Sequence, residues 1–526
     1  YNQYELYKGA YDSARFYYTC QPFEMDSLDN FSEKSFRLKG ELVSAGIFPV
    51  IKEDLKIMPD YSLGFSTLAP PEGHVFYGTK AMYKNKIVLS NNGLQGAGVI
   101  NFIHSISDSK AFTFLPDSTL GYAKFENKPI ETGIQFPDVT SPDAFITYVP
   151  RQNVLKASST SENELTFFKG EAKLKGTAII QPAGMTGYGI MSMAKANLGS
   201  DAFKFKRYDI DSDTSVFNLK NPYPEEGESP LAFSSTNVNA HISFKDRKGD
   251  FKSNDGEELK TFPVIKYAAK VDIFTWLMDQ DEMELSKKNG GSSSGDININ
   301  TDLNLARPNM FSIHPDQDSL QFAAPKVKFS MKNKVLYCSN TTFIDVADAR
   351  IYPDSAKVTI HKNAVMDPLL NSKIVANYVT KYHTFLNANT RISARRKYTS
   401  EGDYPYYDAD SVKTLIHMDK IGVDSTSQTV ATGTVKSEDG FKLNKYFDYY
   451  GPMKIKAANP LISFSGATRI NHNCEKFAKS WMSFSAEIDP KNIQIPVTAN
   501  MKTLDGKAIA AGIVWRDSRQ KDSIRL

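Results

Sequence analysis

Apolar and polar residues alternate along most of this chain with a period of two. The pattern is clearest in KVKFSMKNKVLYC (326–338), AKVTIHK (356–362) and GPMKIKAANPLISFSGATRI (451–470). Residues two apart lie on the same face of a strand, so these segments predict strands with one apolar face and one lysine-lined face. Turn-forming residues separate such segments at short, regular intervals, which is typical of all-β proteins. We therefore predict an all-β chain of stacked antiparallel sheets, in sandwich, jellyroll or β-solenoid-like units.

One turn sequence recurs before the predicted strands. It reads LPDSTLGYAKF from residue 115, YPDSAKVTI from residue 352 and, more loosely, HPDQDSLQF from residue 314. Proline fixes φ at the first corner of a turn, and Asp and Ser hydrogen-bond to the backbone just beyond it. The sequence predicts hairpin or strand-to-strand corners at these three places.

Helical spacing occurs in the segment 367–388, where Leu370, Ile374, Tyr378 and Tyr382 lie four apart. The same segment holds many β-branched residues, which favour strands. Both interpretations stay open, and we favour the strand.

An internal duplication connects two parts of the first half of the chain. Residues 76–114 align without a gap with residues 167–205, at an offset of 91 residues. The identical pairs include Phe76 with Phe167, Ala81 with Ala172, Lys84 with Lys175, Ala111 with Ala202, Phe112 with Phe203 and Phe114 with Phe205. Three glycines of each copy also coincide, namely Gly93, Gly96 and Gly98 with Gly184, Gly187 and Gly189. Such internal repetition is typical of stacked or repeated β-units.

The duplication and a segment rich in glycine and serine divide the chain into predicted regions. KKNGGSSSGD (287–296) has the composition of a flexible linker. We predict an N-terminal β segment, a first β repeat, a second repeat with an extension, a flexible linker and a C-terminal β-rich domain. Their predicted bounds are 1–70, 71–160, 161–288, 289–296 and 297–526.

The glycines of SNNGLQGAGVINF (90–102) admit a functional and a structural interpretation. A dinucleotide-binding loop has the order G-x-G-x-x-G and opens a helix, whereas this stretch reads G-x-x-G-x-G and runs into the strand-like VINFIHSIS. Missing side chains at Gly96 and Gly98 allow a neighbouring layer to approach closely, and Gly93 suits a turn with positive φ. We therefore predict a structural role for the repeated glycines of both copies.

A cluster of carboxylates and aromatic rings is a candidate ligand-binding surface. EGDYPYYDADS (401–411) holds Asp403, Tyr404, Tyr406, Tyr407, Asp408 and Asp410. Aromatic rings can stack on sugars, and a pair of carboxylates can cleave a glycosidic bond. The same residues also fit the solvated tip of a hairpin, which we favour.

Two motifs resemble parts of metal sites. DIDSDTS (209–215) has aspartates at the spacing that opens a calcium loop, but Thr214 and Lys220 stand where such a loop needs Gly and Glu. We favour a turn there. The motif HNC offers His472 and Cys474 as metal donors, whereas a structural zinc site needs four ligands. We predict neither a metal nor a cofactor.

Composition and motif content argue against several classes of protein. Lys+Arg number 63 and Asp+Glu 60, a net charge of +3 without a basic block, which argues against nucleic-acid binding. The apolar run AIAAGIVW (508–515) is shorter than the roughly 20 residues of a membrane-spanning helix, so we predict no transmembrane segment. The sequence holds no H-E-x-x-H or P-loop motif, and we predict a protein that is not an enzyme.

Several stretches resemble very large secreted or envelope proteins of Bacteroidota. The resemblance lies in FIDVADARIYPDSAKVTI, FLNANTRISARRKYTSEGDYPYYD, IGVDSTSQTVATGTV and the N-terminal SLGFSTLAPPEGHVFYGTKAMYKNKIVLSNNGLQGAGVINF. The succession of strands that ends in ATGTV is also similar to the β-jellyroll repeats of lipopolysaccharide-transport proteins. These resemblances imply an extracytoplasmic location, in the periplasm or on the surface of a Gram-negative bacterium.

We therefore predict a structural or binding component of a bacterial cell envelope or surface assembly. Its expected partners are other envelope proteins or surface polymers, including lipopolysaccharide. One alternative is a lipid or lipopolysaccharide conduit, which requires an elongated apolar groove. Another is a glycan-binding or glycan-active protein, which requires carboxylates and aromatic rings in one cleft.

Overall fold

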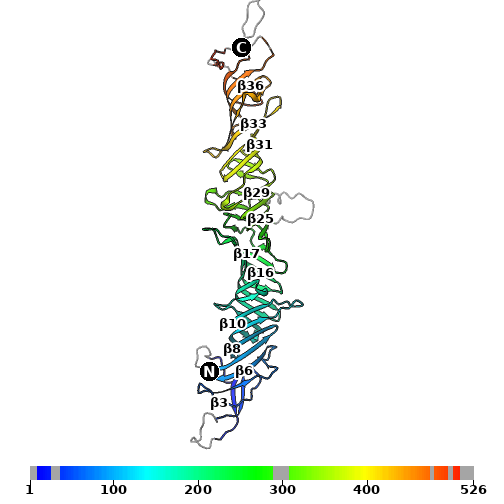
Figure 1. Cartoon of the computed structure of the whole chain (residues 1–526), viewed down its shortest axis with the longest axis vertical. Coiled ribbons are helices and arrows are strands. Elements are labelled where there is room, and N and C mark those ends of the chain that lie inside the picture. Colours follow the sequence, from blue (N-terminus) through cyan, green and yellow to red (C-terminus); the bar gives the residue numbers. More distant parts are fainter. Residues whose placement is uncertain are drawn as a thin grey trace, which may run out of the picture. The chain divides into compact units, whose positions relative to one another are not determined.

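The computed structural model describes residues 9–24, 36–287, 307–473, 475, 479–495 and 501–509. These residues form antiparallel strands joined by tight turns and three-residue 3-10 turns, and no α-helix occurs among them (Figure 1). The predicted all-β fold of antiparallel sheets is confirmed.

The chain forms two compact units, each built from two stretches of sequence. Unit 1 comprises Tyr1–Glu258 and Ile273–Asp281, and unit 2 comprises Leu259–Asp272 and Glu282–Leu526. Unit 1 therefore contains both copies of the duplication. The predicted flexible linker, 289–296, lies outside the described residues.

Unit 1 is a meander, because nearly every strand pairs with the strands before and after it in the sequence. Its strands are β1 (Phe16–Cys20), β2 (Gly40–Ser44), β3 (Lys56–Ile57), β4 (Leu63–Leu68), β5 (His74–Val75), β6 (Met82–Ser90), β7 (Gly93–Phe102), β8 (Ser105–Leu115), β9 (Ser118–Asn127), β10 (Val139–Val149), β11 (Val154–Ser158), β12 (Leu165–Phe167), β13 (Ala172–Gln181), β14 (Gly184–Met193), β15 (Ala196–Phe205), β16 (Asp209–Lys220), β17 (Leu231–Ser243), β18 (Lys248–Ser253) and β21 (Ile273–Leu277). In the long strands, the alternation of apolar and polar residues places one row of side chains in the interior.

The duplication is visible strand by strand. β4 to β10 of the first copy match β11 to β17 of the second, and β7 and β14 correspond residue for residue. A corner repeats as well: the backbone N–H of Tyr77 donates to Ile47 O at 2.9 Å, and that of Phe168 donates to Asp138 O at 3.3 Å. Both corner residues have a φ of 50°. The sequence repeat therefore encodes a repeated structural unit.

Long strands of unit 1 bend near their middle. The pairing of β7 with β8 shifts between Gly96 and Gly98, and that of β14 with β15 shifts between Gly187 and Gly189. Beyond such a bend the two halves of one strand have different neighbours: β10 pairs through one half with β11 and through the other with β12. One meander thereby folds over its own apolar interior.

Aromatic rings fill this interior in both copies. Phe76 and Phe114 lie 5.6 Å apart between ring centroids, and the matching Phe167 and Phe205 lie 4.8 Å apart. All four side chains are buried. The repeated phenylalanines are therefore core residues.

Unit 2 continues with shorter strands and then a second large sheet. Its strands are β19 (Lys260–Phe262), β20 (Tyr267–Ala269), β22 (Glu282–Ser286), β23 (Met310–Ser312), β24 (Gln321–Phe322), β25 (Lys326–Ser330), β26 (Val335–Ser339), β27 (Ile344–Val346), β28 (Ala349–Tyr352), β29 (Lys357–Ile360), β30 (Leu369–Ala376), β31 (His383–Ala394), β32 (Lys397–Tyr407), β33 (Lys413–Val423), β34 (Thr429–Val435), β35 (Lys442–Asn444), β36 (Phe447–Lys456), β37 (Ile462–Ile470) and β38 (Met482–Ile488). The large sheet has the order β27-β28-β30-β31-β32-β33-β34-β36-β37-β38, with β35 beside β36.

Bends in unit 2 are supported by buried hydroxyl groups. The Thr390 hydroxyl lies 2.8 Å from Ser372 Oγ and 2.9 Å from Ser400 Oγ. Ser372 also donates to Ala388 O at 2.8 Å, beside a shift in the pairing of β30 with β31. The hydroxyls replace backbone partners that the irregular pairing removes.

The segment 367–388 and the three recurrent turns have defined places in the fold. Residues 367–388 form the strands β30 and β31 with a turn between them, so the favoured strand interpretation is confirmed. The first recurrent turn joins the hairpin of β8 and β9. The second, after Tyr352, joins β28 to β29, which pair with different strands, and the third contains a 3-10 turn, Pro315–Gln317.

Candidate functional site

The repeated glycines are packed against backbone and rings. A Cβ at Gly96 would lie 2.8 Å from both Lys86 O and Phe114 Cε2, and one at Gly187 would lie 2.5 Å from Thr177 O. No side chain fits either position without a shift of its neighbours.

The other repeated glycines have further structural roles. Gly93 has a φ of 83° where β7 begins, and a Cβ there would meet Tyr11 Oη at 2.8 Å. Gly184 and Gly189 also have positive φ values, of 134° and 131°. A Cβ at Gly98 would lie 2.8 Å from Tyr83 Oη. The stretch resembling a phosphate loop is thus part of a bent hairpin.

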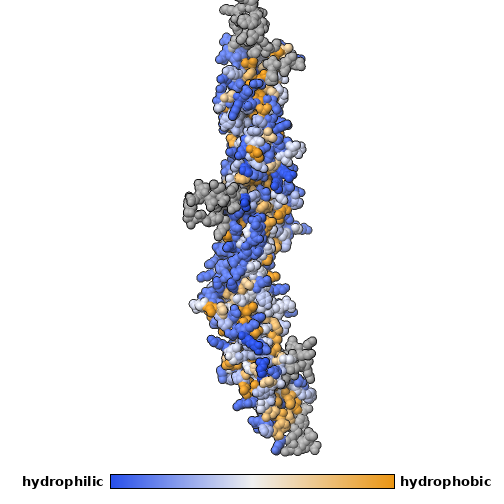
Figure 2. Space-filling view, turned by 180° about the vertical axis from the view of Figure 1, so that it is seen from behind, coloured by the Kyte–Doolittle hydropathy of each residue, from blue (hydrophilic) through white to orange (hydrophobic). Residues whose placement is uncertain are grey.

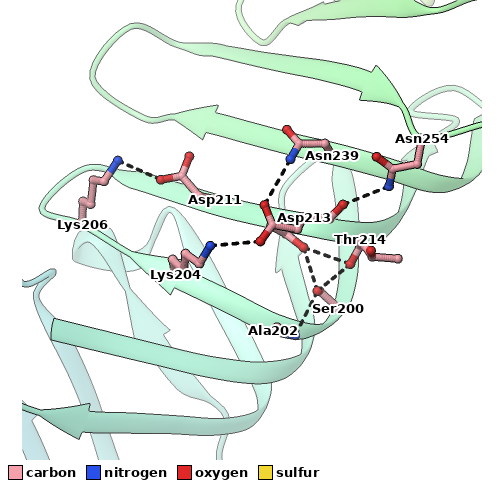
Figure 3. A network of polar contacts seen from close by, with 10 residues as sticks. Ser200, Ala202, Lys204, Lys206, Asp211, Asp213, Thr214, Asn239 and Asn254 are labelled. Carbon is pink, nitrogen blue, oxygen red and sulfur yellow. Dashed lines mark hydrogen bonds and ion pairs between the residues drawn. The ribbon is translucent and has the colours of Figure 1, made fainter. Parts of the chain in front are cut away.

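A polar network supports the bend of β15 and β16 (Figure 3). The pairing of β16 shifts after Ser212, which leaves two carbonyl groups outside the ladder. Ser200 Oγ donates to Thr214 O at 2.7 Å, and Asn254 Nδ2 donates to Asp213 O at 2.9 Å. Ser200 also accepts the Ala202 N–H at 3.1 Å.

The first copy has an equivalent serine. Ser109 Oγ donates to Tyr122 O at 2.6 Å and accepts the Ala111 N–H at 3.1 Å. Sequence reasoning did not single out Ser109 and Ser200, although the offset of 91 aligns them. Both copies therefore have a serine that supports the backbone at the bend.

The aspartates of DIDSDTS lie within strand β16, so the favoured turn is wrong. Asp211 contacts Lys206 Nζ at 2.9 Å and His241 Nδ1 at 2.6 Å, and Asp213 contacts Lys204 Nζ at 2.9 Å. Burial would raise the pKa of Asp211, but hydrogen bonds from His241 and Lys206 outweigh it, and the pKa lies below its usual value. Within the described ranges, no three His, Cys, Asp or Glu side chains are grouped so as to hold a metal ion.

The ligand surface expected at 403–410 is divided by strand alternation. Tyr404 and Tyr406 point into the core from β32, where they are 8% and 1% exposed. Tyr404 Oη lies 3.1 Å from His383 Nδ1, and Tyr406 Oη donates to Leu443 O at 2.8 Å. Burial raises the pKa of Tyr404 to about 12. Both rings are therefore inaccessible to a sugar.

The remaining members of that surface lie outside the core in separate contacts. Asp403 contacts His417 Nδ1 at 3.1 Å, and Asp408 accepts the backbone N–H of Asp410 and Val412, each at 2.9 Å. Asp410 pairs with Lys445 at 3.6 Å. Tyr407 is exposed at the end of β32. The hairpin tip begins only at Asp408, and most of the cluster belongs to the strand.

The cysteines and the HNC motif provide no assembled site. Cys338 is buried, and burial raises the pKa of its thiol to about 12. Cys20 is exposed. Cys474 lies outside the described residues, so the structure does not test its pairing with His472.

Unit 2 contains a cavity of about 720 Å³, which falls in the size range of small-molecule sites. Turns after β27, β30, β31 and β33 contribute to it, together with the segment around β24. It is lined by Pro308, Gln321, Phe322, Ala323, Phe343, Asp345, Ala347, Asp348, Asn377, Tyr378, Val379, Arg395, Arg396 and Ser427. These residues come from distant parts of the sequence, so no local motif indicates the cavity.

Three residues of the cavity wall contact Arg350, which does not itself line the cavity. Arg350 donates to both carboxylate oxygens of Asp345, at 2.8 and 2.9 Å. Its guanidinium carbon lies 3.8 Å from the Phe343 ring centroid and 5.4 Å from that of Tyr378. Such planar, bidentate pairing holds the guanidinium in one orientation and neutralises the charge of the Asp345 carboxylate.

Asp348 ties two turns together beside the cavity. Its Oδ1 accepts the Thr429 backbone N–H at 2.9 Å and the Thr429 hydroxyl at 2.6 Å. Its Oδ2 is buried, and no described residue donates a hydrogen bond to it. Asp348 Oδ2 therefore has lone pairs that accept no hydrogen bond from the described residues.

No protein-family model, curated protein or solved structure matches this chain. In the described residues, no helix has the length and apolar character required to span a membrane.

Proposed function

We propose that this protein is a non-enzymatic structural or binding component of a bacterial cell envelope or surface assembly. Its interior supports this proposal. Buried rings and aliphatic side chains fill the space inside the meander, while lysines and carboxylates occupy the outer faces of the strands. Hydrophilic residues also cover most of the face in Figure 2, with hydrophobic residues in patches. Such a chain has a rigid packed core and a polar outer surface that partners can bind.

The arrangement of the candidate chemistry favours binding over glycoside cleavage. Cleavage requires two carboxylates that face each other across a sugar-sized gap. Asp403 pairs with His417, and Asp408 is engaged by the backbone of its own turn. The neighbouring Tyr404 and Tyr406 face the opposite side of the strand. This arrangement supports a structural or binding component over a glycan-active protein.

The conduit alternative requires space for acyl chains in the interior. Phe76, Phe114, Phe203 and Phe205 are at most 3% exposed and pack on one another within their copies. A lipid would have to displace these contacts, which individually contribute on the order of 1 kcal/mol. A packed interior thus favours a structural or binding component over a lipid conduit.

Photocrosslinking separates the two functions. A photoreactive phenylalanine analogue is placed at Phe203, in the interior, or at Tyr188, which is 45% exposed on the outer face. Circular dichroism confirms folding, and each protein is then irradiated with lipopolysaccharide vesicles. We expect no lipid adduct at Phe203, whereas an adduct at Phe203 that is absent at Tyr188 would support the conduit instead.

Cosedimentation tests the binding function itself. The full chain is centrifuged with isolated envelopes and with purified surface polysaccharides. We expect saturable binding to at least one of them. The absence of binding to every envelope fraction would contradict the proposed function.

A further inference from the structure

The cavity of unit 2 has a cationic rim. Arg395 and Arg396 occupy the turn between β31 and β32, and both are exposed. Within the described ranges Arg395 has no ion-pair partner, and Arg396 pairs only at 3.4 Å with Asp318. The side chains of that pair are 70% and 58% exposed, so solvent and salt weaken it.

The acidic groups on the wall offset this rim only in part. Arg350 already neutralises Asp345 through two hydrogen bonds. Asp348 keeps its negative charge, because its hydrogen-bond donor Thr429 is neutral, but one of its oxygens is buried. Arg395 and Arg396 both line the cavity, and a guanidinium group binds carboxylate, sulfate and phosphate oxygens through two parallel hydrogen bonds.

The remaining wall combines an aromatic ring with polar groups. Tyr378 is 40% exposed, and Val379 beside it is 77% exposed. Asn377 fixes this turn because its Oδ1 accepts the backbone N–H of Val379 and Thr380, both at 3.1 Å. An aromatic face next to fixed polar groups suits a sugar ring, whose C–H face is apolar and whose edge carries hydroxyl groups.

We propose that this cavity binds an anionic saccharide, with Arg395 and Arg396 holding its acidic groups and Tyr378 stacking on a sugar ring. An acyl chain fits poorly, because charged and amide groups line the space. The inference rests on the proposed function in one respect only, since it takes the ligand to be a surface polymer. It assigns that ligand to a site other than residues 403–410.

The charge of Arg395 can be reversed without removing the hydrogen bonds of its backbone. Arg395 is held through its main chain, because its N–H donates to Gln317 O at 3.0 Å and its carbonyl accepts the Ala347 N–H at 2.9 Å. Replacement of its side chain therefore leaves these bonds in place. The test variant is R395E/R396E. The matched control is R391E/K413E, which makes the same change in net charge at two exposed residues that do not line the cavity.

Calorimetric titration of the full chain uses tetragalacturonate as the probe. Neutral cellotetraose and tetraglutamate are the comparison ligands. We expect tetragalacturonate to bind, R395E/R396E to weaken binding at least about tenfold, and the control to change it less than about twofold. Tyr378→Ala should also weaken binding, while Tyr378→Phe, which keeps the ring, should preserve it.

Four results would overturn the inference. Equal binding of cellotetraose would show that charge is not recognised, and equal binding of tetraglutamate would indicate an acidic peptide ligand. Equal loss in the R391E/K413E control would show a general charge effect. If tetragalacturonate fails to bind while the chain still cosediments with envelopes, the cavity assignment falls and the proposed function stands.

Discussion

At the scale of single residues, the bends depend on glycines that have no room for a side chain. Gly187 and Gly199 lie on the neighbouring strands β14 and β15. A Cβ at Gly187 would approach Thr177 O to 2.5 Å and Phe205 Cε2 to 2.9 Å, whereas one at Gly199 would meet nothing within 4 Å.

Valine at these two glycines should therefore have different effects. We expect Gly187→Val to lower the free energy of unfolding by about 2–3 kcal/mol, because overpacking forces backbone or ring to move. Gly199→Val, the control, should change it by less than about 0.5 kcal/mol. Denaturant titration measures both variants. Equal losses would show that β-branching, and not close approach, decides the outcome.

A buried histidine gives unit 2 a defined pH dependence. His383 is 2% exposed, its Nε2 lies 2.7 Å from Asn459 O, and its Nδ1 lies 3.1 Å from Tyr404 Oη. Burial lowers its pKa below 6.5, although the bond to Asn459 opposes this. Well above pH 6.5 the folded and unfolded states both hold the ring neutral. As the pH falls, the unfolded chain takes up a proton that the folded state resists, so stability is lost.

The histidine can be tested by thermal unfolding between about pH 7.5 and pH 5. We expect His383→Gln to be less stable than the natural protein at neutral pH and to show a shallower decline as the pH falls. His361→Gln, at a partly exposed position, is the control. An unchanged slope in His383→Gln would assign the acid sensitivity to another group.

At the scale of elements, a serine supports one bent strand pair in each copy. Ser109 is 5% exposed and satisfies both Tyr122 O and the Ala111 N–H. Ser109→Ala should lower the free energy of unfolding by about 1–2 kcal/mol, because two backbone groups lose their partner. Ser192→Ala, on the outer row of β14, is the control and should cost less than about 0.5 kcal/mol. Hydrogen exchange at Ala111 provides a local readout, and unchanged protection there would contradict this role.

The strands were more predictable than their bends. Alternation in the sequence marks which side chains face inward, and it applies even to DYPYY, where Tyr404 and Tyr406 point inward and Asp403 points outward. Because alternate residues of a strand lie on opposite faces, the residues of this stretch do not form one cluster. The position of a bend depends on an extra residue in the pairing, as after Ser212, and the period of two does not specify it.

At the scale of the whole molecule, the sequence revealed the repetition but not the cavity. The offset of 91 residues can be found by aligning the sequence with itself, and the strands from β4 to β17 repeat at that offset. The cavity in unit 2 is assembled from turns that are far apart in the chain, from Pro308 to Ser427. Its arginines carry no motif, and only the fold brings them to Tyr378.

The two copies share their core positions but differ in what surrounds them, which yields a prediction about the whole of unit 1. Phe114 has the rings of Phe48, Phe76 and Tyr83 within 5.6 Å of its centroid. Its counterpart Phe205 has Phe167 at 4.8 Å and Phe203 at 5.6 Å. Phe48 lies before the first copy and packs onto it, so the first copy is the more heavily supported of the two.

Truncation of the two phenylalanines should reveal this asymmetry. We expect Phe114→Ala and Phe205→Ala each to lower the free energy of unfolding by about 3–5 kcal/mol, with the larger loss for Phe114. Tyr188→Ala, on the outer face, is the control, with an expected loss below about 1 kcal/mol. A double variant, Phe48→Ala with Phe114→Ala, should lose less than the sum of its parts, because the two rings lie 5.1 Å apart. Strict additivity would show that the N-terminal segment lies on the first copy without stabilising it through this contact.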